Sequence, residues 1–137
     1  LRGARMPDSD DTDPAVTREL QQAQQALDDA TKAREADLSD AAVINRLYYA
    51  AFHAIQAVLY DRGFEPTSHG GVLSLFGSEI IAADDAPRRD GRFFSQLSEL
   101  RQQADYGYDE LDEDVDALLS RTQQLVDDME DLCISSD

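Results

Sequence analysis

The apolar residues between positions 41 and 59 constrain the fold more than any other feature, because they recur at steps of three and four and cover almost every face of a helix. They are Ala41, Ala42, Ile44, Leu47, Tyr48, Ala51, Phe52, Ile55, Val58 and Leu59. A helix that is apolar nearly all round has to be covered by other elements. We therefore predict a central buried helix, which ends at Gly63 because glycine adopts a positive φ at little cost.

Helical spacing continues on both sides of this stretch, and no segment shows the alternation typical of a strand. Asp13 followed by Pro14 is typical of a helix N-terminus, and this first helix is expected to end near Ala36. Ser39 or Asp40 is the expected N-cap of the central helix. Three more helices are predicted over about 69–83, 92–104 and 110–132, and Gly70 and Gly71 suggest that another group closely approaches the first of these.

These segments predict an all-α fold, an antiparallel up-and-down bundle of about five helices around a four-helix core. The chain of 137 residues is the right length for one domain, and we place that domain at residues 14–134. Residues 1–13 have no apolar periodicity and are expected to form a disordered tail, in which Leu1 to Arg5 precede Met6 as a cloning remnant.

The charge is strongly negative, with a formal net value of −17 and a pI of about 4.2. Of the 29 acidic residues 21 are Asp, and Lys32 is the only lysine among 12 basic residues. Such a surface favours a salt-adapted cytoplasm, because molar salt screens the self-repulsion of the acidic groups. It also repels phosphates, so no DNA partner is expected and any contact with RNA must be local.

Several classes of protein are excluded by residue type. The single cysteine, Cys133, permits no intramolecular disulfide and favours a reducing cytoplasm. No run approaches the roughly 18 consecutive apolar residues of a membrane helix, so we expect a cytoplasmic protein that has no membrane partner. The two histidines, His53 and His69, lie on different predicted helices and belong to no metal-binding pattern. We expect no metal and no cofactor.

Three polar clusters are candidates for binding or chemistry. Arg46, Tyr49 and His53 follow one another at steps of three and four, so they share a helix face that could bind a phosphate or pair with a carboxylate on a neighbouring helix. His69 follows Thr67-Ser68 at a predicted helix N-terminus, where backbone N–H groups can bind an anion or the residues can simply cap the helix.

The third cluster lies at the end of the fourth predicted helix. Arg101 and Asp105 are four residues apart and can form an ion pair on one helix face, which would orient the guanidinium. The alternative is an exposed salt bridge that contributes only a few tenths of a kcal/mol. Tyr106-Gly107-Tyr108 then interrupts the helix.

Two segments carry a resemblance to a known family. NRLYYAAFHAIQAVLYDRGFEPTSHGGVLSLF at 45–76 and LSELRQQADYGYDE at 97–110 resemble the HEPN superfamily, specifically its small prokaryotic branch. The resemblance extends over about 15–132 and implies an up-and-down bundle that forms a homodimer through the helices bearing these motifs.

In many members of that family an Arg is followed, after four to six intervening residues, by a His, and the two form a metal-independent ribonuclease site across the dimer cleft. Arg101 matches this Arg, and the resemblance makes Arg101, Asp105 and Tyr106 the candidate catalytic residues. The motif His is absent, because position 106 is Tyr and no His follows it. Since a Tyr with a pKa near its ordinary value of about 10 is a poor base, His53 or His69 would have to take over the proton transfer.

The family is also often encoded beside a minimal nucleotidyltransferase, the pair acting as toxin and antitoxin, and in some pairs a Tyr near the Arg motif accepts AMP. Tyr106 and Tyr108 are candidate acceptors by resemblance. Three functions therefore stay open at this point. The chain is the dimeric partner of a nucleotidyltransferase or of RNA, an endoribonuclease that uses Arg101, or a non-catalytic helical scaffold.

Overall fold

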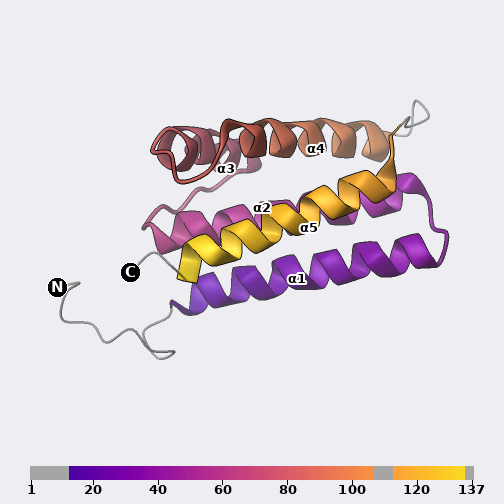
Figure 1. The fold of residues 1–137 in the computed structure, drawn as a ribbon, viewed down its shortest axis with the longest axis horizontal. Coiled ribbons are helices and arrows are strands. Elements are labelled where there is room, and N and C mark those ends of the chain that lie inside the picture. The colour runs from indigo at the N-terminus through magenta and orange to yellow at the C-terminus, as the bar shows by residue number, and fades with distance from the viewer. Residues whose placement is uncertain (1–12, 107–112, 135–137) are drawn as a thin grey trace.

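The computed structural model describes residues 13–106 and 113–134, and within these ranges every regular element is a helix. Four long helices lie side by side, with α1 and α4 on opposite sides and α2 and α5 between them (Figure 1). The elements are α1 (Pro14–Glu35), α2 (Asp40–Asp61), α3 (His69–Leu75), the π-helical η3 (Phe76–Ile81), α4 (Arg88–Tyr106) and α5 (Val115–Ile134). The predicted all-helical bundle of five helices is confirmed.

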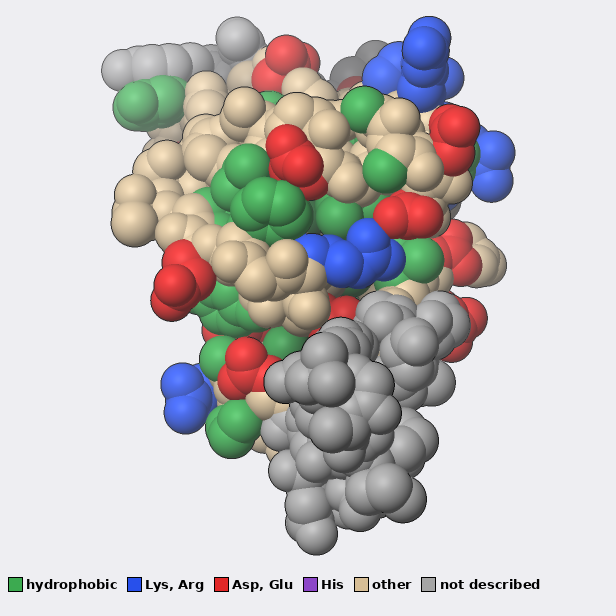
Figure 2. All heavy atoms as spheres, turned by 90° about the vertical axis from the view of Figure 1, so that its left-hand side faces the viewer, with side chains coloured by type: hydrophobic (Ala, Val, Ile, Leu, Met, Phe, Trp, Pro, Cys, Tyr) green, Lys and Arg blue, Asp and Glu red, His purple; other side chains and the backbone are tan. Residues whose placement is uncertain are grey.

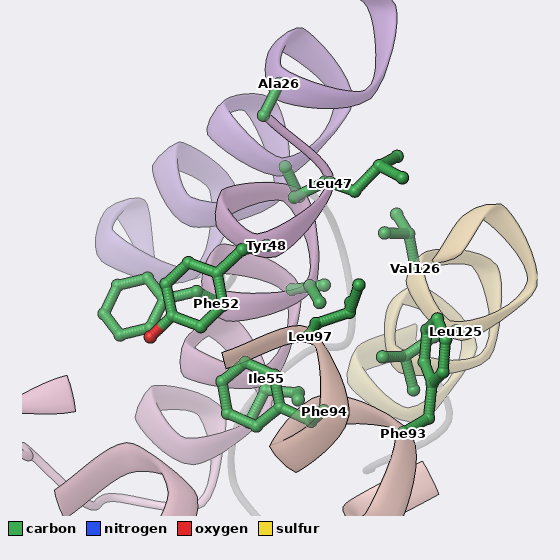
Figure 3. Packing of buried hydrophobic residues seen from close by; sticks show 14 of the residues in the cluster. Ala26, Leu47, Tyr48, Phe52, Ile55, Phe93, Phe94, Leu97, Leu125 and Val126 are labelled. Carbon is green, nitrogen blue, oxygen red and sulfur yellow. The ribbon is translucent and has the colours of Figure 1, made fainter. Parts of the chain in front are cut away.

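Helix α2 is the centre of the molecule, because it packs against α1, α4 and α5. Leu47, Tyr48 and Ile55 are almost completely buried, and they meet Phe94 and Leu97 of α4 and Leu125 and Val126 of α5 (Figure 3). The prediction of a central buried helix over 41–62 is thereby confirmed. Its polar residues, including Asn45, Arg46, Tyr49 and His53, are only partly covered, so they mark the part of α2 that the bundle leaves open.

Side-chain caps fix the starts of the helices. The carboxylate of Asp13 accepts a hydrogen bond from the Ala15 N–H at 2.8 Å, and the hydroxyl of Ser39 accepts one from Ala42 at 3.1 Å. The Ser68 hydroxyl accepts one from the Gly71 N–H at 2.9 Å, which places His69 in the first turn of α3. Since each bond satisfies a backbone donor that lacks a partner within the helix, these residues determine where the chain enters each helix.

The predicted start of the fourth helix was wrong. Helix α4 begins at Arg88 and not at 92, because Pro87 lies just before the helix, where its fixed φ is tolerated, and because Asp90 is buried in an ion pair with Arg121 of α5. Gly91 therefore lies inside α4, where a Cβ would come within 2.6 Å of the Ile81 Cδ1 atom. The close approach predicted at Gly70 and Gly71 occurs at Gly71 alone, where a Cβ would lie 3.1 Å from the Ser68 Oγ atom.

The third and fifth helices also differ from the prediction. The segment predicted as one helix over 69–83 is an α-helix followed by the π-helical η3, and a Cβ at Gly70 would meet nothing within 4 Å. Helix α5 begins at Val115, where the Asp114 carboxylate accepts a hydrogen bond from the Ala117 N–H at 3.1 Å. Residues 107–112, which include Tyr108 and the predicted start at 110, lie outside the described residues.

In the described ranges no helix combines the length and the apolar character that crossing a membrane requires. One end of the bundle shows acidic side chains beside hydrophobic groups and separate basic ones, with no continuous basic field (Figure 2). The surface on that side is therefore of mixed charge.

Candidate functional site

The ring of Tyr49 is surrounded by two guanidinium groups and two imidazole rings. The Cζ atoms of Arg46 and Arg101 lie 5.2 and 5.9 Å from its centroid. The His69 and His53 rings lie 5.9 and 6.3 Å from it, centroid to centroid. Residues from α2, from the first turn of α3 and from α4 thus meet at one place. These residues form the Tyr49 cluster, which consists of Arg46, Tyr48, Tyr49, His53, His69 and Arg101.

The residues that α2 supplies lie on one face, as their spacing predicts, but their partners differ. The Nε and Nη2 atoms of Arg46 donate to the Asn45 Oδ1 atom at 3.1 and 2.7 Å. The Nδ1 atom of His53 instead lies 2.7 Å from the Glu19 Oε1 atom on α1. Within the described residues, His53 therefore pairs with a carboxylate of a neighbouring helix, whereas Arg46 does not.

Tyr48 connects His69 to Arg101. Its hydroxyl lies 2.8 Å from the His69 Nδ1 atom, and the Arg101 Cζ atom lies 4.8 Å from the centroid of its ring. Burial raises the pKa of Tyr48, and the nearby Arg101 charge acts in the opposite direction. Partial burial lowers the pKa of His69, with Arg101 and His53 adding to the effect, which favours the neutral form of this imidazole.

Arg101 forms the predicted ion pair, because its Nη1 atom donates to the Asp105 Oδ2 atom at 2.9 Å. The arginine side chain is 20 % exposed and that of Asp105 is 45 % exposed. The buried Nε atom of Arg101 has no hydrogen-bond partner within the described part of the chain. A guanidinium has five N–H donors, and among the described residues the Asp105 carboxylate is the acceptor that Arg101 reaches.

The model of the HEPN domain family matches residues 16–132. This chain belongs to the HEPN domain family. The resemblance found in the sequence is thereby confirmed. Arg101, which the resemblance aligns with the Arg of the family motif, approaches the same Tyr48 ring as His69, at 4.8 and 5.8 Å from its centroid, and no His follows Arg101 in the sequence.

Several relatives match part of this chain. A UPF0332 protein of Thermotoga maritima is 34% identical over 85 residues, which are 62% of this chain and 64% of the relative. Putative toxin MJ0605 of Methanocaldococcus jannaschii is 29% identical over 85 residues, 61% of this chain and 63% of its own length. The UPF0332 protein glr0978 of Gloeobacter violaceus is 34% identical over 88 residues, 64% of this chain and 69% of its own. This HEPN domain is thus related to proteins named as putative toxins, and the match spans less than two thirds of the length of the first two relatives.

The remaining candidates of the sequence lie near the cluster or outside the described residues. Tyr106 ends α4, about one turn beyond Arg101, and is 69% exposed. Tyr108 belongs to the residues that are not described. The described part of the HEPN domain contains no group of three or more His, Cys, Asp and Glu residues that could hold a metal ion.

Sequence reasoning missed two residues of the site. Tyr48 was counted only as a core residue, because its position fits the apolar period, although its hydroxyl requires a partner when it is buried. Glu19 was missed as the partner of His53. The signal that could have found it is a carboxylate at the helical spacing of Val16, Ala23 and Ala26, on the apolar stripe of α1.

Proposed function

We propose that this HEPN domain is a toxin-type protein that binds RNA at the Tyr49 cluster and cleaves it. The observation that supports this proposal is the meeting of Arg46, Arg101, His53 and His69 around one tyrosine ring in a chain of net charge −17. In so acidic a protein, two arginines and two histidines at one place form a local site for an anion.

The chemistry of the cluster suits single-stranded RNA. Guanidinium groups bind phosphate oxygens through paired N–H donors, and the aromatic rings between them can stack on unpaired bases. Arg46 and Arg101 approach the same Tyr49 ring, so one nucleotide can contact both kinds of group. The homodimer that the family resemblance implies would place a second copy of these residues across a cleft, and we include it in the proposal.

The positions of Arg101 and His69 around the Tyr48 ring support cleavage at this site. His69 takes the proton of the RNA 2′-hydroxyl, and the resulting oxygen attacks the adjacent phosphorus. The bond from phosphorus to the 5′-oxygen breaks, which yields a 2′,3′-cyclic phosphate and a 5′-hydroxyl, while Arg101 stabilises the charge on the phosphate. His69 thereby replaces the motif histidine whose position Tyr106 occupies, and Tyr48 holds its ring.

The test is cleavage of total cellular RNA by the purified protein in high-salt buffer with a chelator. Arg101→Ala should abolish cleavage while the oligomer mass stays the same. Arg62→Ala is the matched control, because Arg62 also pairs with one carboxylate, Asp85 at 2.7 Å, and its side chain is 27 % exposed. Undiminished cleavage by the Arg101 variant would refute the nuclease proposal, whereas RNA binding without cleavage by the wild type would leave a binding role.

A second proposal concerns a minimal nucleotidyltransferase as partner. Tyr106 is exposed and lies beyond Arg101 at the end of α4, which favours it as an acceptor of AMP. In this reaction the phenolic oxygen forms a bond to the α-phosphorus of ATP, and pyrophosphate is the leaving group. Intact mass and peptide analysis of the protein from its native cells should reveal one or more adenylyl groups on Tyr106 or Tyr108. An unmodified protein from cells that contain such a partner would count against the proposal. If neither cleavage, RNA binding nor modification is found, the scaffold alternative remains.

A further inference from the structure

A buried carboxylate on α1 holds the second histidine of the Tyr49 cluster. Glu19 is only 9% exposed, and its Oε1 atom accepts hydrogen bonds from the His53 Nδ1 atom at 2.7 Å and from the Gln56 Nε2 atom at 2.8 Å. An ionised carboxylate can only accept, so the proton of this bond belongs to His53 Nδ1. The other ring nitrogen, Nε2, is then the one available for proton transfer, and the side chain is 24 % exposed.

Both imidazoles contact the same two aromatic rings. The Phe52 centroid lies 4.4 Å from that of His69 and 5.3 Å from that of His53, and the Tyr49 ring lies near both. Their partners differ in charge, since His69 is bound to the neutral phenol of Tyr48 and His53 to the carboxylate of Glu19. A carboxylate stabilises a protonated imidazole, whereas a phenol beside an arginine does not.

We propose that His53, oriented by Glu19, is the general acid of the site and donates its proton to the 5′-oxygen that leaves the phosphorus. The proposal rests on the proposed RNA cleavage. His69 receives the proton of the 2′-hydroxyl, the oxygen–phosphorus bond forms, the bond to the 5′-oxygen breaks, and that oxygen leaves as a hydroxyl with the proton from His53 Nε2. His69 gains one proton and His53 loses one, so proton exchange with water returns both rings to their starting states without any further reactant.

The decisive experiment compares ordinary RNA with RNA in which sulfur replaces the 5′-bridging oxygen at one phosphate. A thiolate leaves without being protonated, so cleavage of the sulfur-containing RNA does not need a general acid. His53→Ala should cleave ordinary RNA about 100-fold or more slowly than the wild type, since loss of a general acid has effects of this order. It should cleave the sulfur-containing RNA at close to the wild-type rate. His69→Ala should be slow on both.

A second variant guards against a loss of folding. In His53→Gln the side-chain amide can still donate to Glu19 but cannot transfer a proton, so it should show the same pattern as His53→Ala with unchanged helical circular dichroism. Glu19→Gln is the test of the positioning residue. Glu19→Gln should slow cleavage of ordinary RNA less than the His53 variants do. On the sulfur-containing RNA it should cleave at close to the wild-type rate.

The possible results distinguish the role of His53 as general acid from the RNA cleavage on which it depends. If the wild type cleaves RNA and both His53 variants cleave ordinary RNA at the wild-type rate, the inference is wrong and the nuclease proposal stands. If the variants are equally slow on both substrates, His53 is not the acid. If the wild type does not cleave RNA, both proposals fail together.

Discussion

A buried ion pair between α4 and α5 permits a quantitative prediction for stability. The carboxylate of Asp90 is 1% exposed and accepts a hydrogen bond from the Arg121 Nη2 atom at 2.5 Å, while its Oδ2 atom has no partner among the described residues. The Arg121 Cζ atom also lies 4.8 Å from the Phe93 ring centroid. Arg121→Met keeps a long side chain over that ring and removes only the charge and its donors.

The expected cost follows from the charge that remains. Removing one partner of a buried pair destabilises a protein by about 3–5 kcal/mol, because the other charge is left without compensation. The Arg121 side chain is 28 % exposed, so water reaches this pair in part and we expect a value of about 3 kcal/mol. For a domain of this size that corresponds to a fall in Tm of roughly 10 °C.

The assay is urea denaturation followed by circular dichroism, with Arg34→Met as the control. Arg34 joins α1 to α5 through Asp116, with Nε and Oδ1 2.8 Å apart, but the two side chains are 44 % and 69 % exposed. Loss of such an exposed pair should cost much less free energy of unfolding, because water and salt screen it. The reasoning would be refuted if Arg121→Met lost no more free energy of unfolding than Arg34→Met.

Three more predictions follow from the site and from α5. Partial burial lowers the pKa of His69, so the unfolded chain binds the imidazole proton at a higher pH than the folded protein does. The free energy of unfolding should therefore fall as the pH drops below about 6.5, and it should fall less in His69→Gln. The same change of urea midpoint with pH in both proteins would contradict this. Tyr48→Phe removes the hydrogen bond to His69 and should cost about 1 kcal/mol in the free energy of unfolding and slow RNA cleavage; an unchanged rate would count against the role of Tyr48. Burial raises the pKa of Cys133 to about 12, so iodoacetamide should alkylate the native protein far more slowly than the urea-unfolded chain, as followed by intact mass.

The fold was predictable because helical periodicity and caps are local signals. The apolar period of α2 and the caps Asp13 and Ser39 are properties of neighbouring residues, and each predicted its element. The start of α4 was missed because Pro87 and Gly91 are typical of a loop by residue type. What makes this segment helical is its packing on η3 and on Arg121, which no local pattern contains.

The site was predictable only within single helices. Steps of three and four placed Arg46, Tyr49 and His53 on one face and paired Arg101 with Asp105, and both arrangements occur. The meeting of His69 with Arg101 depends on where the short helix α3 lies against α2 and α4, which is a tertiary fact. The catalytic and binding roles of all these residues stay predictions until the variants are measured.

The arrangement around Tyr49 has a consequence for how mutational data on this protein should be read. Arg46, Arg101 and both histidines share contact with a single ring, so replacing any one of them changes the surroundings of the others. Effects of neighbouring residues with a common partner are not additive. Only double-mutant cycles that include Tyr49 can therefore separate what each side chain contributes from what the ring supplies to all four.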